Sequence, residues 1–263
     1  MGLTHSPLIP ADGLLLGVDA ANPRCYPGAG TSIDDLLLVA SPVNQPVKHR
    51  ANSVTTDDDQ PHFPVAGTLE NGVGFTSENG GVFTFDGTDD YIEFTSETLN
   101  PGFPTSMLCW FKIDQNTAGQ GIFSLRFHAS RYYGFFVNVN ASAVLSMHIG
   151  DGGSAGSGAR RTGSRDTTMD TGRWYHGAFV WNALVEDMVM YIDGELQAIT
   201  YSGTGDKLFY GDSSADPKVW KQRIGVLNDK YLDGAVAQVL FYGRVLTEKE
   251  ILDHYAATKG RFE

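Results

Sequence analysis

The stretch that decides the fold is FFVNVNASAVLSMHI, residues 135–149. Apolar Phe135 and Val137 alternate with polar residues such as Asn138, and the second half repeats this alternation up to His148. A period of two is typical of a β-strand with one side against a core. We therefore predict an antiparallel strand pair, with the side that carries Asn138 and His148 in solvent.

Similar patterns occur on both sides of this pair. GGVFTFDGTDDYIEF, residues 80–94, predicts a β-hairpin around an Asp-Gly turn. MVMYIDGELQAI, residues 188–199, predicts a tighter one, because Asp193 and Gly194 favour the positive φ angles of a two-residue turn. Between them, the Gly, Ser and Arg residues of segment 150–166 predict a loop.

One segment, residues 247–258, has helical rather than strand periodicity. Thr247 and Glu250 are spaced as a capping box, in which each side chain accepts an N–H of the first turn. The charged residues and His254 fall away from the predicted packing face. That face consists of Ile251, Leu252, Tyr255 and Ala256.

Length alone suits one large all-β domain as well as two smaller ones, but no break in composition marks a second domain. The chain has 263 residues with 31 Gly, 11 Pro and 19% charged residues, which fits many short strands joined by turns. We predict an N-terminal arm over residues 1–12 and one domain over residues 13–263, with a long Pro-rich excursion at 37–66. Cys25 and Cys109 lie in unlike settings, and two buried thiols are favoured over a disulfide.

The charge balance excludes two classes of partner. A formal net charge of −12 disfavours binding to nucleic acid and to anionic membranes, because both require positive surface. The first 21 residues contain no Lys or Arg before a short apolar run. We therefore expect no signal peptide and no membrane anchor, and a protein that stays where it is made or leaves inside an assembly or by cell lysis.

Several weak motifs then occur in an order that is typical of one fold family. GGVFTFDGTDDYIEF is followed by SMLCWFKI, GRWYHGAFVWN, MVMYIDGELQ, QRIGV and LDGAVAQVLFYGRVLTEKEILDHY. This series, over residues 67–258, resembles the concanavalin-A-like jelly rolls of the laminin-G type. The resemblance implies an all-β, antiparallel concanavalin-A-like jelly-roll sandwich with an N-terminal arm and a short C-terminal helix that packs on it.

Both flanks carry a narrower resemblance. LLLGVDAANPRCYPGAGTSIDDL, residues 14–36, and YAATKGRF, residues 255–262, resemble the flanks of such jelly rolls in virion proteins of tailed bacteriophages. This implies a non-enzymatic decoration or cement protein on the capsid exterior. Its partners would be capsid or other virion proteins, and we expect a homo-oligomer, with a trimer as the first expectation. The residues expected to contact neighbouring chains are Leu3, His5, Lys259, Arg261 and Phe262.

Two other functions stay open. The first is a carbohydrate-binding adhesin, on a phage tail or secreted by a bacterium, with polysaccharide as its partner. The second is a glycosidase, which needs two carboxylates held close together. The Glu-x-Asp-x-x-Glu motif of laminarinase-type enzymes is absent, and Glu93 with Glu97 fits a solvated pair better. Relatives commonly have an acidic pair where this chain has Ala237 and Gln238, so we predict no enzyme.

A single turn holds the candidate metal ligands. Asp86, Asp89 and Asp90 could bind calcium, as loop carboxylates in lectin-like jelly rolls often do. The alternative, which we favour, is that they cap N–H groups of the turn. No cofactor is otherwise required.

Arginines and aromatic residues are the remaining candidates for contact with a ligand or partner. Three arginines in the predicted 150–166 loop could bind an acidic neighbour, although a solubilising loop is the simpler interpretation. They are Arg160, Arg161 and Arg165. Trp110, Trp174 and Trp181 lie in apolar strand patterns and are expected in the core. The aromatic residues expected to be exposed, as a platform for sugar, are Tyr210 and Trp220.

Overall fold

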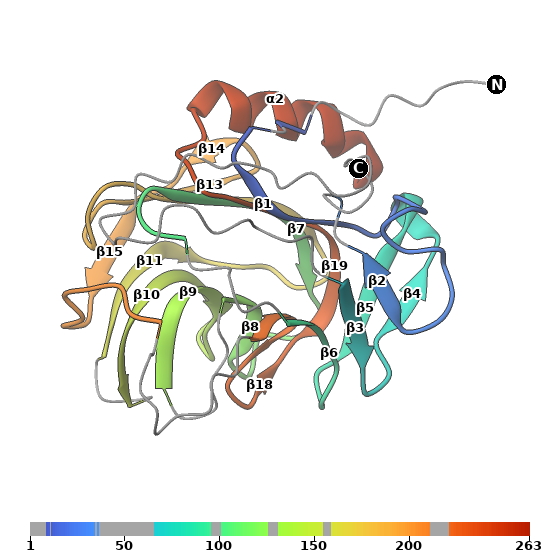
Figure 1. Cartoon of the computed structure of the whole chain (residues 1–263), viewed down its shortest axis with the longest axis horizontal. Helices are drawn as coiled ribbons and strands as arrows, with labels where there is room; N and C mark the ends of the chain where they lie inside the picture. Colours follow the sequence, from blue (N-terminus) through green and yellow to red (C-terminus); the bar gives the residue numbers. More distant parts are fainter. Residues whose placement is uncertain are drawn as a thin grey trace.

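The computed structural model has two antiparallel β-sheets face to face, with helix α2 on the outside of one of them (Figure 1). It describes residues 9–10, 12–34, 36, 66–95, 101–125, 131–154, 159–210 and 221–263. The predicted jelly-roll sandwich is confirmed. Most of the predicted arm and of the predicted excursion lies outside the described residues.

The first sheet, which we call sheet A, contains eight strands among the described residues. Seven follow the order β14-β13-β12-β7-β19-β5-β4, and β1 also pairs with β19. The strands are β1 (Leu14–Asp19), β4 (Gly74–Thr76), β5 (Val82–Asp86), β7 (Thr105–Ile113), β12 (Trp174–Trp181), β13 (Met188–Ile192), β14 (Glu195–Leu196) and β19 (Asp233–Tyr242).

The second sheet, sheet B, contains nine strands among the described residues, in the order β15-β11-β10-β9-β8-β16-β6-β3-β2. They are β2 (Ser32–Asp34), β3 (Ala66–Glu70), β6 (Tyr91–Thr95), β8 (Gln120–Ser124), β9 (Arg131–Val139), β10 (Val144–Ser154), β11 (Arg160–Thr168), β15 (Ile199–Ser202) and β16 (Lys221–Ile224). β17 (Val226–Leu227) and β18 (Lys230–Tyr231) form a separate two-stranded sheet next to β8. The helical segments are η1 (Glu78–Gly80), α2 (Glu248–Thr258) and η2 (Lys259–Arg261).

The main core is the apolar layer between the sheets. Phe135 of β9 lies against Phe241 of β19, with ring centroids 6.2 Å apart, and Phe123 of β8 stacks on the same ring at 5.4 Å. Burial of each such side chain stabilises the fold by roughly 1.5–3 kcal/mol. One buried cluster extends from Leu14 to Ile251, so the first described strand and the last helix share this core.

The hairpin predicted over residues 80–94 is wrong. β5 pairs with β4 and β19 in sheet A, whereas β6 pairs with β3 and β16 in sheet B. The Asp-Gly turn therefore joins the two layers of the sandwich. Phe85 and Phe94 still point into one core, but from opposite sheets. Alternation identifies the buried side of a strand and not the strand beside it.

The expected solvent side of the β9–β10 pair is also wrong, although the pairing itself is confirmed. His148 is 3% exposed and stacks on Phe136 at 4.5 Å. Its Nε2 lies 2.5 Å from Asn138 Oδ1, and its Nδ1 lies 2.8 Å from Thr162 Oγ1. Phe136 joins Leu227 of β17 in a second small apolar cluster, so the outer side of sheet B is partly covered.

The predicted loop over 150–166 is mostly strand. β10 continues to Ser154 and β11 begins at Arg160, so the connection is much shorter than expected. Glycines in this segment pack closely: a Cβ on Gly150 would lie 2.4 Å from the backbone of Tyr132. Elsewhere, Cys25 and Cys109 are both buried thiols that are not joined in a disulfide, as predicted.

Helix α2 begins where the sequence predicts. The Thr247 side chain accepts the Glu250 N–H and the Glu250 carboxylate accepts the Thr247 N–H, which confirms the capping box. The packing face is different: Leu252 is 40% exposed, and His254 is buried together with Ile251. A polar partner on sheet A accounts for this, as described below. Within the described residues, no helix has the length and apolarity that a membrane span requires.

Candidate functional site

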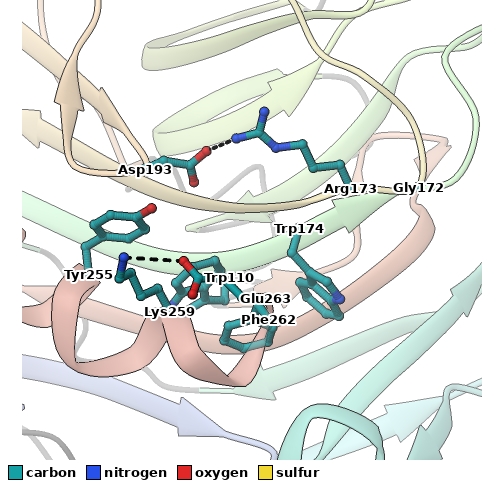
Figure 2. Close-up of a pocket in the computed structure, with 9 residues that line it drawn as sticks. All are labelled: Trp110, Gly172, Arg173, Trp174, Asp193, Tyr255, Lys259, Phe262 and Glu263. Atoms are coloured by element: carbon teal, nitrogen blue, oxygen red, sulfur yellow. Dashed lines mark hydrogen bonds and ion pairs between the residues drawn. The ribbon is translucent and has the colours of Figure 1, made fainter.

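A hollow lies where the last turn of α2 and the tail that follows it meet the outer face of sheet A (Figure 2). Its volume is about 450 Å³, within the usual range for small-molecule sites. We call it the tail pocket. It is lined by Trp110, Gly172, Arg173, Trp174, Asp193, Tyr255, Lys259, Phe262 and Glu263.

Strand alternation brings Trp110 to this surface. Its neighbours on β7, Cys109 and Phe111, belong to the main core, whereas Trp110 forms a separate cluster on the outer face. The Trp110 indole N–H donates to Thr258 Oγ1 at 2.8 Å, and Phe262 stacks on the ring at 4.2 Å. The helix end and the tail therefore hold the indole in place.

Trp174 forms the second indole wall. Its ring lies 4.8 Å from that of Phe262. The side-chain amide of Asn79 orients this wall: its oxygen accepts the Trp174 indole N–H at 3.0 Å, and its nitrogen donates to the Arg261 carbonyl at 2.8 Å. Trp174 is only partly buried, so part of its ring is available to a ligand.

Two ion pairs border the pocket. Figure 2 shows the Arg173–Asp193 pair on the strand side and the Lys259–Glu263 pair on the side of the helix and tail. The predicted Asp193–Gly194 turn is confirmed by positive φ angles of 54° and 80°. The turn directs Asp193 Oδ1 to the backbone N–H of His176 at 2.9 Å, and this bond fixes the carboxylate.

A buried histidine pair lies beneath the pocket. His176 Nε2 of β12 is 2.9 Å from His254 Nδ1 of α2, and both side chains are almost fully buried. Burial, together with the charge of Arg261, lowers the pKa of His254 to about 4, and burial also lowers the pKa of His176 well below its usual value. One ring must donate and the other accept, and two neutral rings satisfy this. His176 Nδ1 and His254 Nε2 are buried and make no hydrogen bond within the described residues, so an added proton would place a buried charge and an N–H without an acceptor there. This pair is the polar contact that buries His254.

The tail is anchored to its own domain. Arg261 Nε donates to the Asn79 carbonyl at 3.0 Å, and Arg261 forms an ion pair with Asp19 of β1 at 3.3 Å. Phe262 packs on Trp110, and Lys259 lines the pocket. The expected contact of these tail residues with neighbouring chains stays a prediction, and Leu3 and His5 lie outside the described residues.

Comparison with known proteins identifies the fold family. Residues 86–252 match a laminin G family model described as the concanavalin A-like lectin/glucanases superfamily. The chain belongs to this superfamily. Its laminin-G-like jelly roll thus confirms the resemblance seen in the sequence. No match was found among curated protein sequences.

Solved structures similar to this concanavalin A-like domain include binding domains of botulinum neurotoxins. The binding domain of neurotoxin DC in complex with SialylT has a TM-score of 0.60 and 11% identity, and covers 94% of this chain. The same domain in complex with rat synaptotagmin II has a TM-score of 0.59 and 11% identity, and covers 94% of this chain. The serotype D binding domain has a TM-score of 0.60 and 13% identity, and covers 93% of this chain. The chain spans about half of these structures, 51%, 52% and 52% respectively, and at such identities the likeness shows the fold alone.

The acidic turn of this concanavalin A-like domain brings its three carboxylates together. One oxygen each from Asp86, Asp89 and Asp90 lies within 4.8 Å of the others, which is compatible with one shared cation. Two capping bonds are also present, from Thr88 N–H to Asp86 and from Asp86 N–H to Asp90. Burial raises the pKa of Asp90, and the neighbouring carboxylates Asp86 and Asp89 raise it further.

The three arginines do not form one cluster. Arg160 lies over the Tyr132 ring at 4.6 Å, on the outer side of sheet B. Arg161 pairs with Glu186 at 2.8 Å, and Arg165 donates to the Gln197 side chain at 2.8 Å. Arg161 and Arg165 therefore already bind groups of their own domain.

Among the aromatic residues, the sequence interpretation was correct for Trp181, which is fully buried in the core. Trp110 is also buried, at 3% exposure, but in a smaller cluster on the outer face of sheet A and not between the sheets. The interpretation was wrong for Trp174, which is only partly buried against that cluster. The Tyr210 hydroxyl donates to the Pro101 carbonyl at 2.7 Å. Trp220 lies outside the described residues.

The structure describes one of the two carboxylates that were considered for a glycosidase. Glu93 binds Arg223 at 2.6 Å and Lys221 at 2.8 Å, so its charge is compensated twice. The Gln238 side-chain amide donates to the Asp19 carboxylate at 2.9 Å. Glu97 lies outside the described residues. A compensated carboxylate is a poor acid or nucleophile, and the aromatic tail pocket is better suited to binding.

Proposed function

We propose that this domain is a non-catalytic carbohydrate-binding module carried on a virion surface. The tail pocket supports the binding function. It combines aromatic walls with charged side chains, one of which, Asp193, is held in place by the backbone N–H of His176.

Sugar rings present C–H groups on their faces and hydroxyls at their edges, and this pocket offers partners for both. The exposed part of the Trp174 ring and the Tyr255 ring provide apolar faces for stacking. Asp193 can accept and Arg173 can donate hydrogen bonds to adjacent hydroxyls, because Asp193 is held by the His176 N–H. This is the arrangement expected of a site that binds without chemical change.

The test is binding of a broad glycan panel, followed by calorimetry on the best oligosaccharide. Trp174→Ala should weaken binding at least tenfold. Trp174→Phe should recover part of the lost affinity, because a phenyl ring still offers a face on which the sugar can stack. Leu184→Ala is a matched control, because Leu184 is 69% exposed and does not line the pocket. Absence of binding, with and without calcium, or unchanged binding by a folded Trp174→Ala protein, would refute carbohydrate recognition at this site.

A second proposal concerns where the module acts. We propose a decoration or cement protein on the capsid exterior, with virion proteins as partners and a trimer as the first oligomer to test. It is supported by the resemblance of the two flanks to those of jelly rolls in phage virion proteins; in the structure these flanks meet through Asp19 and Arg261. Light scattering of the purified protein measures the oligomer.

Quantitative mass spectrometry of purified particles tests the location. A copy number close to that of the main shell protein is expected for a decoration protein. A few copies per particle would indicate a tail adhesin instead, and absence from particles would refute the virion proposal while leaving carbohydrate binding untouched.

A calcium ion is the proposed ligand of the turn that holds Asp86, Asp89 and Asp90. The fit is partial: three carboxylates supply oxygens, and water or backbone carbonyls would complete the shell. A cation there would offset the mutual repulsion that raises the pKa of Asp90.

A further inference from the structure

The charges around the tail pocket are matched in pairs, and this pairing limits which sugars fit. Among the described lining residues, two cations face two anions: Arg173 with Asp193, and Lys259 with Glu263. A nearby third cation, Arg261, is directed to Asp19 instead. The pocket therefore presents no cation without a carboxylate beside it.

The Arg173–Asp193 pair is the firmer of the two. Asp193 keeps its second oxygen on the His176 N–H, and its side chain is 18% exposed. The Arg173 guanidinium also lies over the Tyr175 ring at 4.6 Å. A ligand carboxylate or sulfate would have to share the Arg173 charge with Asp193 and would itself face Asp193 and Glu263, so its approach is unfavourable.

A ligand ammonium group meets the converse difficulty, because it would face Arg173 and Lys259. Neutral hydroxyls meet neither. They can donate to a carboxylate and accept from a guanidinium without breaking the ion pair, and bonds to charged partners are the stronger ones. The pocket is thus suited to an uncharged sugar ring.

We propose, resting on the carbohydrate binding proposed above, that the tail pocket selects neutral hexopyranosides over uronic, sialylated and sulfated sugars, and that Asp193 is the residue that sets this selectivity. Its carboxylate cancels the charge of Arg173 and supplies an acceptor for sugar hydroxyls.

The decisive variant is Asp193→Asn. Asn retains an oxygen for the His176 N–H and tolerates the left-handed conformation of residue 193, so the turn should persist. Arg173 then lacks its carboxylate. We expect the wild-type protein to bind neutral oligosaccharides at least tenfold more tightly than matched uronate or sulfated ones, and the variant to reduce that ratio below threefold, with an effect that added salt diminishes.

Asp253→Asn is the matched control, since it removes one negative charge from α2 at a side chain that is 63% exposed and does not line the pocket. It should leave the ratio unchanged. Tighter wild-type binding of acidic glycans, or an unchanged ratio in a folded Asp193→Asn protein, would overturn the selectivity while carbohydrate binding stands. Failure of every glycan to bind, or binding that Trp174→Ala does not weaken, would refute the proposed function and this inference with it.

Discussion

Acidification should weaken the attachment of α2, because protonation of His254 or His176 would place a positive charge on a ring that is buried between α2 and sheet A. The pKa of His254 is about 4 in the folded protein and 6.5 ordinarily. As the pH falls from 6.5 towards 4, the unfolded chain takes up a proton that the folded chain excludes. The contribution of His254 is therefore complete above pH 6.5 and is lost progressively below it.

The two pKa values give the size of the effect. Between pH 7 and pH 4.5, His254 alone should lower the free energy of unfolding by about 2.5 kcal/mol. The pKa of His176 is lowered as well, by burial and by its partner, so His176 adds to the loss. For a domain of ordinary stability, this is a large fraction of the total.

The assay is urea unfolding at a series of pH values for the wild-type protein and for His254→Asn. The Asn amide can take the place of Nδ1 against His176 and does not titrate. The variant should be less stable at pH 7 but should lose about 2.5 kcal/mol less on acidification. Hydrogen exchange should identify α2 as the first element to open.

Lys249→Ala is the control, because the Lys249 side chain is 82% exposed on the far side of α2. Its stability should follow the wild-type pH dependence. If His254→Asn and the wild-type protein lost the same free energy between pH 7 and pH 4.5, the histidine pair would not be the pH-sensitive contact.

Three further predictions concern local contacts. Glu250→Ala should lower the free energy of unfolding by about 1–2 kcal/mol, because it removes the capping box and the ion pair with Arg244. The pKa of Glu250 is about 2, so its contribution is present above pH 4.5 and is lost as the pH falls below that value. Acid unfolding of the variant and the wild-type protein measures the difference. Asp90→Asn should raise Tm at pH 7 without calcium, because it removes a carboxylate whose pKa is raised by burial, and should abolish any calcium-induced rise in Tm; a calcium response equal to the wild type would refute the metal site. Gly67→Ala should cost about 1–3 kcal/mol in denaturant unfolding, because its Cβ would lie 2.5 Å from the Phe94 ring, and a neutral result would contradict the close packing.

Features that depend on neighbours in sequence could be predicted from the sequence. The capping box of Thr247 and Glu250 and the turn at Asp193 and Gly194 satisfy backbone requirements within four residues, so the residue types suffice. The alternation over residues 135–149 identified a strand pair for the same reason.

Features that depend on distant partners could not. Both sides of β7 are covered, one by the core and one by α2, so its uninterrupted apolar run gave no sign that Trp110 faces outward. His254 counts as polar in any periodicity, and the partner that buries it, His176, lies 78 residues away. The tail pocket forms where Trp110 faces outward and α2 packs on sheet A, so the sequence did not predict it.

The position of β19 has a consequence for the order in which the protein can be built during synthesis. This strand lies between β7 and β5 and also pairs with β1, so that Gln238 binds Asp19 across 219 residues of sequence. Until β19 has left the ribosome, β1, β5 and β7 lack the strand that joins them. Sheet A can therefore be completed only late in synthesis, and until then the edges of β1, β5 and β7 that pair with β19 are open to pairing with another chain.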